Sequence, residues 1–240
     1  MASSVKTLNF FLTTEQACSY LPERRAGSVV VDPYTRVSTA MYSTLIDHGF
    51  RRNSGHIYRP HCQACESCIS VRVPVKEFIA SRSQKRVWRR NQDLVVRPVG
   101  LSFQQEHFQL YQRYLESRHR GGGMDDASPE QYNEFIINSG LDGTRLYEFR
   151  LHDRLLAVAV VDQLLQGWSA VYTFFDPDLE ARSLGTHAIL WQINEAQRLG
   201  LSWVYLGYWI KECRKMSYKN QFRPLEIYRA GQWLRIDALS

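Results

Sequence analysis

LYEFRLHDRLLAVAVVDQLLQGWSAVYTFF, residues 146–175, is the stretch that decides the fold. Three apolar runs within it have the length and the β-branched and aromatic content of strands; they cover 146–151, 155–165 and 168–175. The polar turns between these runs, HDR and QG, are short. We therefore expect the three strands to pair with one another as an antiparallel meander.

The residues that follow complete an α+β pattern. A turn, Asp176-Pro177-Asp178, leads into a predicted helix over 184–199 that Gly200 ends. A further strand is expected over 203–208. A meander, a helix and another strand predict a helix packed on a sheet, in the order that suits an N-acetyltransferase-like (GNAT) fold.

The first half of the chain reads as shorter elements. We expect helices, strands and extended stretches as follows: a helix over 36–48 ended by Gly49, extended chain over 50–60, a strand over 69–75 and helices over 81–91, 104–117 and 129–137. Segment 94–102, with Pro98 and Gly100, is the expected junction. The sequence thus predicts a smaller N-terminal module, 1–100, and a GNAT-like module, 101–240.

Composition limits the class of protein. The chain has 240 residues, 44% of them hydrophobic and a net charge of +6, which permits a packed core and binding of polyanions. No run approaches the roughly 18 apolar residues that cross a bilayer, and the N-terminus lacks the signal-peptide pattern. We expect a cytoplasmic protein that does not bind membranes; the oligomeric state is not predicted.

A cysteine cluster is the first feature with chemical potential. Cys62, Cys65 and Cys68 are separated by two residues each, a spacing that lets thiolates share one metal ion. Cys18 is the expected fourth ligand and His61 the alternative. The prediction is zinc or an iron–sulfur cluster, and partly buried reduced thiols are the competing interpretation. Cys213 stands alone in the sequence and is interpreted as a small core residue.

The predicted helix over 81–91 is strongly basic. Its cations fall on one helical face and no acidic residue intervenes; they are Arg82, Lys85, Arg86, Arg89 and Arg90. Like charges this close repel, and phosphates relieve the repulsion. We interpret the face as a phosphate-binding surface, against the alternative of a solvated helix face.

Four further segments are candidates for binding anionic ligands. The pairs Arg24-Arg25 and Arg51-Arg52 could each form parallel hydrogen bonds to a carboxylate. Segment 182–186, RSLGT, is either a plain helix start or a pyrophosphate loop for coenzyme A. Aromatics alternate with cations over 206–219, where Lys215 and Lys219 could hold a nucleic-acid backbone while rings stack on bases or pack in the core.

Taken together, these segments resemble the arginyl-tRNA–protein transferase family in its short bacterial form, the aspartate/glutamate leucyltransferases. The matching segments occur in order along nearly the whole chain: 18–22 (CSYLP), 49–52 (GFRR), 58–68, 82–86, 119–124, 172–177, 205–208 and 215–219. Eukaryotic relatives carry a Cys-x-x-Cys pair at the N-terminus, whereas here Ser19, Tyr20 and Leu21 follow Cys18.

The resemblance implies transfer of leucine from leucyl-tRNA to proteins that begin with Asp or Glu, which marks them for N-end rule degradation. Its expected partners are aminoacyl-tRNA and those proteins. It assigns tRNA binding to the basic helix with Lys215 and Lys219, and reading of the acidic side chain to Arg24, Arg25, Arg51 and Arg52. Arginyl transfer, a coenzyme A-dependent acetyltransferase and a non-enzymatic metal-dependent RNA-binding module remain alternatives.

The expected chemistry needs no cofactor, because the ester of aminoacyl-tRNA is already activated. Positioning can supply roughly 7–11 kcal/mol, far more than the roughly 1.4 kcal/mol lost to protonation of the acceptor amine at pH 7. The candidate catalytic residues are Tyr172, Asp176 and Tyr208, at the ends of predicted strands. Asp176 would hold the amine and the tyrosines would stabilise the oxyanion or orient the terminal adenosine; for Asp176 the alternative is a turn residue.

Overall fold

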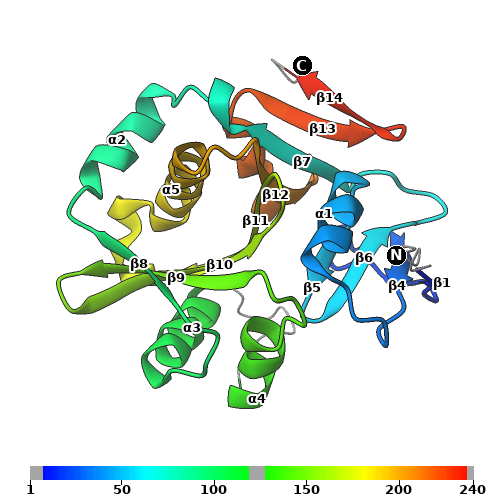
Figure 1. The fold of residues 1–240 in the computed structure, drawn as a ribbon, viewed down its shortest axis with the longest axis horizontal. Helices are drawn as coiled ribbons and strands as arrows, with labels where there is room; N and C mark the ends of the chain where they lie inside the picture. The colour runs from blue at the N-terminus through cyan, green and yellow to red at the C-terminus, as the bar shows by residue number, and fades with distance from the viewer. Residues whose placement is uncertain (1–7, 119–127, 237–240) are drawn as a thin grey trace, which may run out of the picture.

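The computed structural model describes residues 8–118 and 128–236, and it has a mixed α/β architecture (Figure 1). The described strands form sheets of eight, four and two strands. Their bounds are β1 Phe10–Leu12, β2 Gln16–Ala17, β3 Arg25–Ala26, β4 Ser28–Val31, β5 Arg51–Asn53, β6 His56–Pro60, β7 Ile69–Pro74, β8 Val95–Val99, β9 Thr144–Leu151, β10 Arg154–Gln163, β11 Gly167–Phe175, β12 Trp203–Trp209, β13 Leu225–Arg229 and β14 Gln232–Ile236.

The helices include both long α-helices and single turns. Their bounds are α1 Thr39–Asp47, η1 Val75–Glu77, α2 Arg82–Arg90, α3 Gln105–Arg118, α4 Pro129–Tyr132, η2 Asn133–Ile137, η3 Pro177–Arg182, α5 Leu184–Arg198, α6 Arg214–Ser217 and η4 Tyr218–Gln221. The segment 119–124 of the sequence resemblance lies outside the described residues.

The predicted meander is confirmed. β9, β10 and β11 pair in sequence order and antiparallel, and α5 returns the chain to β12, which runs parallel to β11. Gly200 ends α5 with a positive φ of 72°, where a residue without a Cβ avoids a steric penalty. The alternation of side chains along these strands buries one set on each face of the sheet.

The large sheet also takes in strands from the first hundred residues. Its order is β14-β13-β7-β12-β11-β10-β9-β8, so β7 lies between β12 and β13 and β8 forms an edge. Segment 94–102, expected as a junction, therefore contains a strand of the same sheet as residues 101–240. Pro98 is tolerated in β8 because an edge strand needs only one row of ladder hydrogen bonds. The division into 1–100 and 101–240 stays a prediction.

Two hydrophobic cores cover the two faces of this sheet. On one face α5 packs side chains such as Ile189 and Ile193 against β7, β9, β10, β11 and β12, with α2 beside it. On the other face α3 packs Phe108 and Leu115 against β9 to β11, and η2 adds Ile136. Figure 1 shows α5 and α2 on one side of β8–β10 and α3 and α4 on the other.

A third core joins the N-terminal sheet, in the order β1-β4-β6-β5, to the large one. Tyr42 and Ile46 of α1 pack here with Ile57 of β6 and, from the large sheet, Tyr205 of β12. Packing in this core places β5 beside the large sheet, next to β11 and β12. None of the helices in the described part of the chain combines the length and apolar character that a bilayer crossing needs.

Candidate functional site

β11 and β12 diverge at the centre of the large sheet. Their parallel pairing runs from Gly167 and Trp203 to Ser169 and Tyr205, and no later pair occurs in the described residues. Both strands nevertheless continue, β11 to Phe175 and β12 beyond a register shift after Tyr205. Backbone groups along the opening must find other partners, since buried peptide groups are almost always hydrogen-bonded.

Arg51, the first residue of β5, reaches into this opening. Its Nη2 donates a hydrogen bond to the Ala170 carbonyl oxygen of β11 at 2.9 Å. Its guanidinium lies against Gly207 of β12, where an added Cβ would be 3.2 Å from Nη2. Gly207 also has a φ of +82°, so a side chain there would be strained as well as crowded. Arg51 thus bridges the diverging strands.

The charge of Arg51 is not compensated. The residue is 7% exposed, its Nη1 is buried without a hydrogen-bond partner, and no carboxylate pairs with it among the residues described. An unpaired charge removed from water is unfavourable by several kcal/mol, in order of magnitude. Such a group favours binding of an anion that would restore its partner.

Lys219 places a buried basic side chain near Arg51. It is 7% exposed, and its Nζ donates to the Tyr208 carbonyl oxygen at 2.7 Å. Burial first, and then the positive charge of Arg51, together lower the pKa of Lys219 to about 7. A bound anion would favour the charged form of Lys219, so the two residues together make an electropositive site.

The other predicted arginines have partners. Arg52 is buried and forms two hydrogen bonds to Asp162, from Nε at 2.7 Å and from Nη2 at 2.8 Å. Arg24 is exposed with Nη1 3.2 Å from the Cys65 sulfur, and Arg25 lies 3.6 Å from a Glu15 carboxylate oxygen. Because successive strand residues point to opposite faces, Arg51 and Arg52 occupy different environments.

The candidate catalytic residues lie in different surroundings. The Tyr208 hydroxyl donates to the Gly49 carbonyl oxygen at 3.0 Å, and burial raises its pKa well above the ordinary value. The ring of Tyr172 packs at 5.0 Å from that of Phe135 on the opposite, α3-covered face, and its buried hydroxyl has no partner in the described chain. Burial likewise raises the pKa of Tyr172.

Asp176 is 1% exposed and holds two arginines. It accepts hydrogen bonds from Arg113 at 2.7 Å and Arg154 at 2.5 Å, and its side chain caps η3 through the Asp178 amide. The carboxylate therefore fixes the turn between β11 and α5. Among the described residues, Asp176, Tyr172 and Tyr208 share none of these partners, and their joint catalytic role stays a prediction.

The cysteines gather around Cys68. Burial first, and then the neighbouring thiols, together raise its pKa to about 12; the thiols are those of Cys62, Cys18, Cys65 and Cys213. Cys213, expected in the core, is instead only partly buried and belongs to this cluster. Thiols are suitable donors for a soft metal ion. Within 8–118 and 128–236, however, no three His, Cys, Asp or Glu residues are arranged to hold one.

The cations of α2 are exposed, as a phosphate-binding face requires. Ser81 and Gln84 form a reciprocal capping box that fixes the start of the helix. Arg90 donates to the Ala181 carbonyl oxygen, whereas Arg82, Lys85, Arg86 and Arg89 form no ion pair with any described residue. Lys215 is exposed in α6, but Lys219 is buried and cannot present its amine on the outer surface.

The possible pyrophosphate loop has structural contacts. Arg182 pairs with Asp93 through two hydrogen bonds of 2.8 Å. An added Cβ on Gly185 would lie 3.0 Å from the Phe175 ring, so the glycine allows α5 to approach the end of β11. Packing therefore accounts for both residues without a coenzyme.

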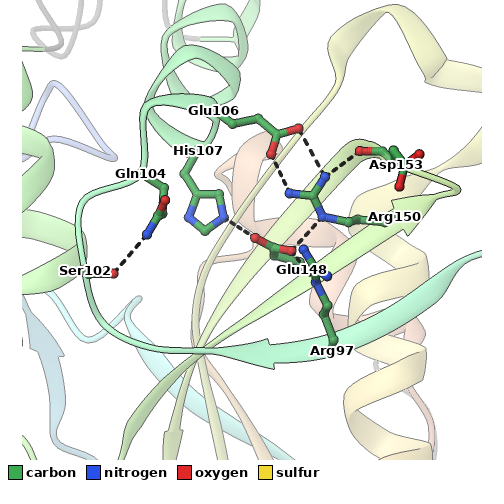
Figure 2. A network of polar contacts seen from close by, with 8 residues as sticks. All are labelled: Arg97, Ser102, Gln104, Glu106, His107, Glu148, Arg150 and Asp153. Carbon is green, nitrogen blue, oxygen red and sulfur yellow. Dashed lines mark hydrogen bonds and ion pairs between the residues drawn. The ribbon is translucent and has the colours of Figure 1, made fainter.

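A charged network that the sequence did not indicate lies at the edge of the large sheet (Figure 2). Glu148 of β9 accepts hydrogen bonds from His107 Nε2 at 2.6 Å, Arg150 Nε at 2.7 Å and Arg97 Nε at 2.8 Å. Burial alone would raise the pKa of Glu148, but these donors lower it to about 2. Glu106 adds a second carboxylate beside Arg150. This network ties α3 and β8 to β9.

Comparisons with known proteins agree over most of the chain. Two family models match, "Arginine-tRNA-protein transferase, N terminus" over residues 16–86 and "Arginine-tRNA-protein transferase, C terminus" over 106–229. The aspartate/glutamate leucyltransferase of Pseudomonas fluorescens (strain Pf0-1) is 52% identical over 227 residues, covering 95% of this chain and 96% of that protein. The protein of that name from Stutzerimonas stutzeri (strain A1501) is 51% identical, covering 98% and 99%.

Solved structures are similar only in part. The structure of L-PGS from Bacillus licheniformis has a TM-score of 0.46 and 11% identity, covering 61% of this chain and 48% of that one. FemX has a TM-score of 0.45 and 8% identity, covering 69% and 59%. At these TM-scores neither structure supports a statement about the site.

Proposed function

The chain belongs to the arginine-tRNA–protein transferase family, and from that membership we propose that it transfers leucine from leucyl-tRNA to proteins that begin with aspartate or glutamate. The observation that carries the proposal is about 50% identity to aspartate/glutamate leucyltransferases over nearly the whole length of both chains. Transfer of this kind marks an N-terminus for degradation, and the place of the reaction would be the cytoplasm.

The opening between β11 and β12 would bind the acceptor end. Arg51 carries a permanent charge and a buried, unpartnered Nη1, which suits a carboxylate already ionised when the acceptor binds. Lys219 would add a second interaction with the same group. This assignment selects Arg51 among the four candidate arginines and moves Lys219 from the tRNA surface to the acceptor site.

The reaction would then proceed by positioning. The neutral α-amine of the acceptor attacks the ester carbonyl carbon, the C–N bond forms, and the bond to the ribose oxygen breaks. The proton lost by the amine ends on the released tRNA hydroxyl. With an α-amino pKa of about 7.7–8.0, roughly a tenth to a fifth of the acceptor is neutral at pH 7, so no strong base is required. Roles for Tyr172, Asp176 and Tyr208 stay predictions.

A GNAT-like fold fits this arrangement. The meander β9–β10–β11, the helix α5 and the parallel strand β12 follow in order, and β11 separates from β12 beside the proposed acceptor site. The N-terminal family module would contribute Arg51 to that opening. Support for this fold comes from the topology of the chain itself.

A metal site at Cys18, Cys62, Cys65 and Cys68 is also proposed, with zinc or an iron–sulfur cluster as the bound species. Its support is the thiol chemistry and the gathering of these side chains around Cys68. Elemental analysis of anaerobically purified protein tests it: metal that falls after Cys65→Ala supports the site, and active protein without metal would contradict a required one.

The function is tested by supplying labelled leucyl-tRNA with peptides that begin with Asp, Glu or Ala. We expect label on the acidic peptides and none on the Ala peptide. Arginyl-tRNA in a parallel reaction tests the alternative donor, and acetyl-coenzyme A without tRNA tests acetyl transfer. Absence of label on acidic peptides with either charged tRNA would contradict the proposal.

tRNA binding by α2 has a separate test. Replacing both Arg86 and Arg89 by Gln should lower the slope of log affinity against log salt by about 1.8, or about 0.9 for each lost phosphate contact. Arg198→Gln is the matched control. Arg198 is an exposed cation at the C-terminal end of α5, outside α2, and it pairs with Glu195. An unchanged salt slope in the double variant would reject the role of α2.

A further inference from the structure

A cavity lies between α2 and α5, apart from the opening between β11 and β12. Its volume is about 470 Å³. The residues that form its walls are Trp88 and Asn91 at the end of α2, Leu94 and Val96 beyond it, and His187 and Trp191 on α5. The transfer reaction as described above uses none of these side chains.

Two indole rings line the cavity, and aromatic side chains of β9 and β11 pack around the one on α5. The ring centroid of Trp191 lies 4.8 Å from that of Tyr147, 5.4 Å from Phe149 and 5.9 Å from Trp168. Trp88 packs against His187, with ring centroids 5.5 Å apart. Trp88 and Trp191 are only partly buried, so both retain ring surface for a ligand. Flat aromatic surfaces of this kind suit a planar ring system.

His187 gives the cavity a polar group that lacks a partner. The side chain is 4% exposed, and its Nδ1 has no hydrogen bond within the described residues. Burial lowers the pKa of His187 to about 4, so the imidazole is neutral near pH 7 and offers one donor and one acceptor. A neutral donor–acceptor pair matches the edge of a heterocyclic base better than it matches an ion.

The surroundings indicate a nucleic acid as the source of that base. Trp88 lies on α2 between Lys85 and Arg89, which are exposed and without ion pairs in the described chain. A ligand that placed a ring against Trp88 would bring its neighbouring phosphates to these cations. The close approach of Gly185 and Phe175 also puts the start of α5 at the end of β11, where β11 has already separated from β12.

We propose that this cavity binds one unpaired base of the donor tRNA, stacked against Trp88 and Trp191 with its edge at His187. The inference rests on the proposed function, since it takes the donor to be a tRNA. A base within a duplex is stacked and paired, so the ligand is expected to come from the single-stranded 3′ end. Binding there would hold the RNA while its terminal ester reaches the acceptor.

The test uses an uncharged acceptor-stem hairpin with a single-stranded 3′ end, measured by fluorescence anisotropy with the full-length protein. Each unpaired nucleotide is made abasic in turn. We expect one abasic position to weaken binding about tenfold, since stacking on an aromatic side chain contributes on this order. The salt slope should stay unchanged, because no phosphate contact is lost.

Trp88→Ala should remove the difference between the intact and that abasic hairpin, and Trp88→Phe should retain most of it. Tyr34→Ala is the matched control, because Tyr34 is 96% exposed and lies outside the cavity. The inference is overturned if no abasic position weakens binding, or if the abasic effect persists unchanged in Trp88→Ala. It is also overturned if Trp88→Ala weakens only leucyl-charged RNA, which would make the cavity a leucine pocket. Leucine transfer by the wild-type protein is measured separately, so failure of this inference is distinguishable from failure of the proposed function.

Discussion

Positive charge is treated differently at the edge of the large sheet and in the opening between β11 and β12. At the sheet edge, Arg150 and Arg97 meet Glu148, and Glu106 adds a further carboxylate (Figure 2). In the opening between β11 and β12, Arg51 has no carboxylate partner within the described part of the chain. Compensated charges stabilise the packing of elements, whereas an uncompensated buried charge favours binding of an anionic ligand.

The same contrast holds between adjacent residues. Arg52 is fully engaged by Asp162, and both side chains are 1% exposed. Arg51, one residue earlier on β5, donates only to a carbonyl oxygen and keeps Nη1 unpartnered. Residue type alone therefore does not identify a recognition site; whether the charge has a partner does.

The largest expected effect is on the free energy of unfolding, at the buried ion pair between Arg52 and Asp162. Asp162→Asn should destabilise the fold by about 3–5 kcal/mol, because it leaves Arg52 as an unpaired buried cation. Chemical denaturation monitored by circular dichroism measures the change. A loss below about 1 kcal/mol would show that the pair is not a structural requirement and would weaken the contrast with Arg51.

Arg51→Gln should change activity much more than it changes stability. We expect the free energy of unfolding to stay within about 1 kcal/mol of wild type, because the substitution removes an unpaired charge as well as one hydrogen bond. The kcat/KM for Asp-peptides should fall about a hundredfold, as expected for loss of a charge-assisted contact. Denaturation and labelled-leucine transfer, each measured on the same preparation, separate the two effects.

Lys219 should produce a smaller effect that depends on pH. Its pKa of about 7 means that the amine loses its charge as pH rises from 6 to 8. A succinyl-peptide keeps the carboxylate of an N-terminal aspartate but has no α-amine, so its inhibition constant reports on the carboxylate alone. That constant should rise about tenfold between pH 6 and 8 in wild type. It should stay flat in Lys219→Met; a matching rise in the variant would assign the titration to another group.

The final prediction concerns the slope of stability against pH in acid, to which Glu148 contributes. Its pKa in the folded protein, about 2, is below the unfolded value of 4.5. Stability from this group is therefore complete above pH 4.5 and is lost as pH falls toward 2. Unfolding free energies measured from pH 5 to 2.5 should fall less steeply in Glu148→Gln than in wild type. Equal slopes would mean that the network does not lower this pKa.

Much of the fold was predictable because its signals are local. Alternation and short turns identified the meander, and Gly49 and Gly200 marked the ends of α1 and α5. β8 was missed because Pro98 and Gly100 are typical of loops, while an edge strand tolerates a proline. The position of β7 between β12 and β13 depends on pairing between distant segments, which no local pattern encodes.

The candidate site was predictable in its residue types and less so in its arrangement. Paired arginines indicated carboxylate binding, but only the fold shows that one is neutralised by Asp162 and its neighbour is not. Lys219 was assigned to the RNA surface because its burial is not visible in a basic segment. Likewise, the cavity beside α2 exists only because α5 brings His187 and Trp191 to Trp88.

The most direct test of the account is the ratio of kcat/KM for a peptide that begins with Asp to that for the same peptide beginning with Asn. The two acceptors differ only in the charge and donor capacity of one side chain. If the uncompensated Arg51 reads the carboxylate, wild type should strongly favour Asp and Arg51→Gln should bring the ratio close to one. A ratio that stays at the wild-type value, with both peptides slowed equally, would contradict the claim that this buried charge selects the acceptor.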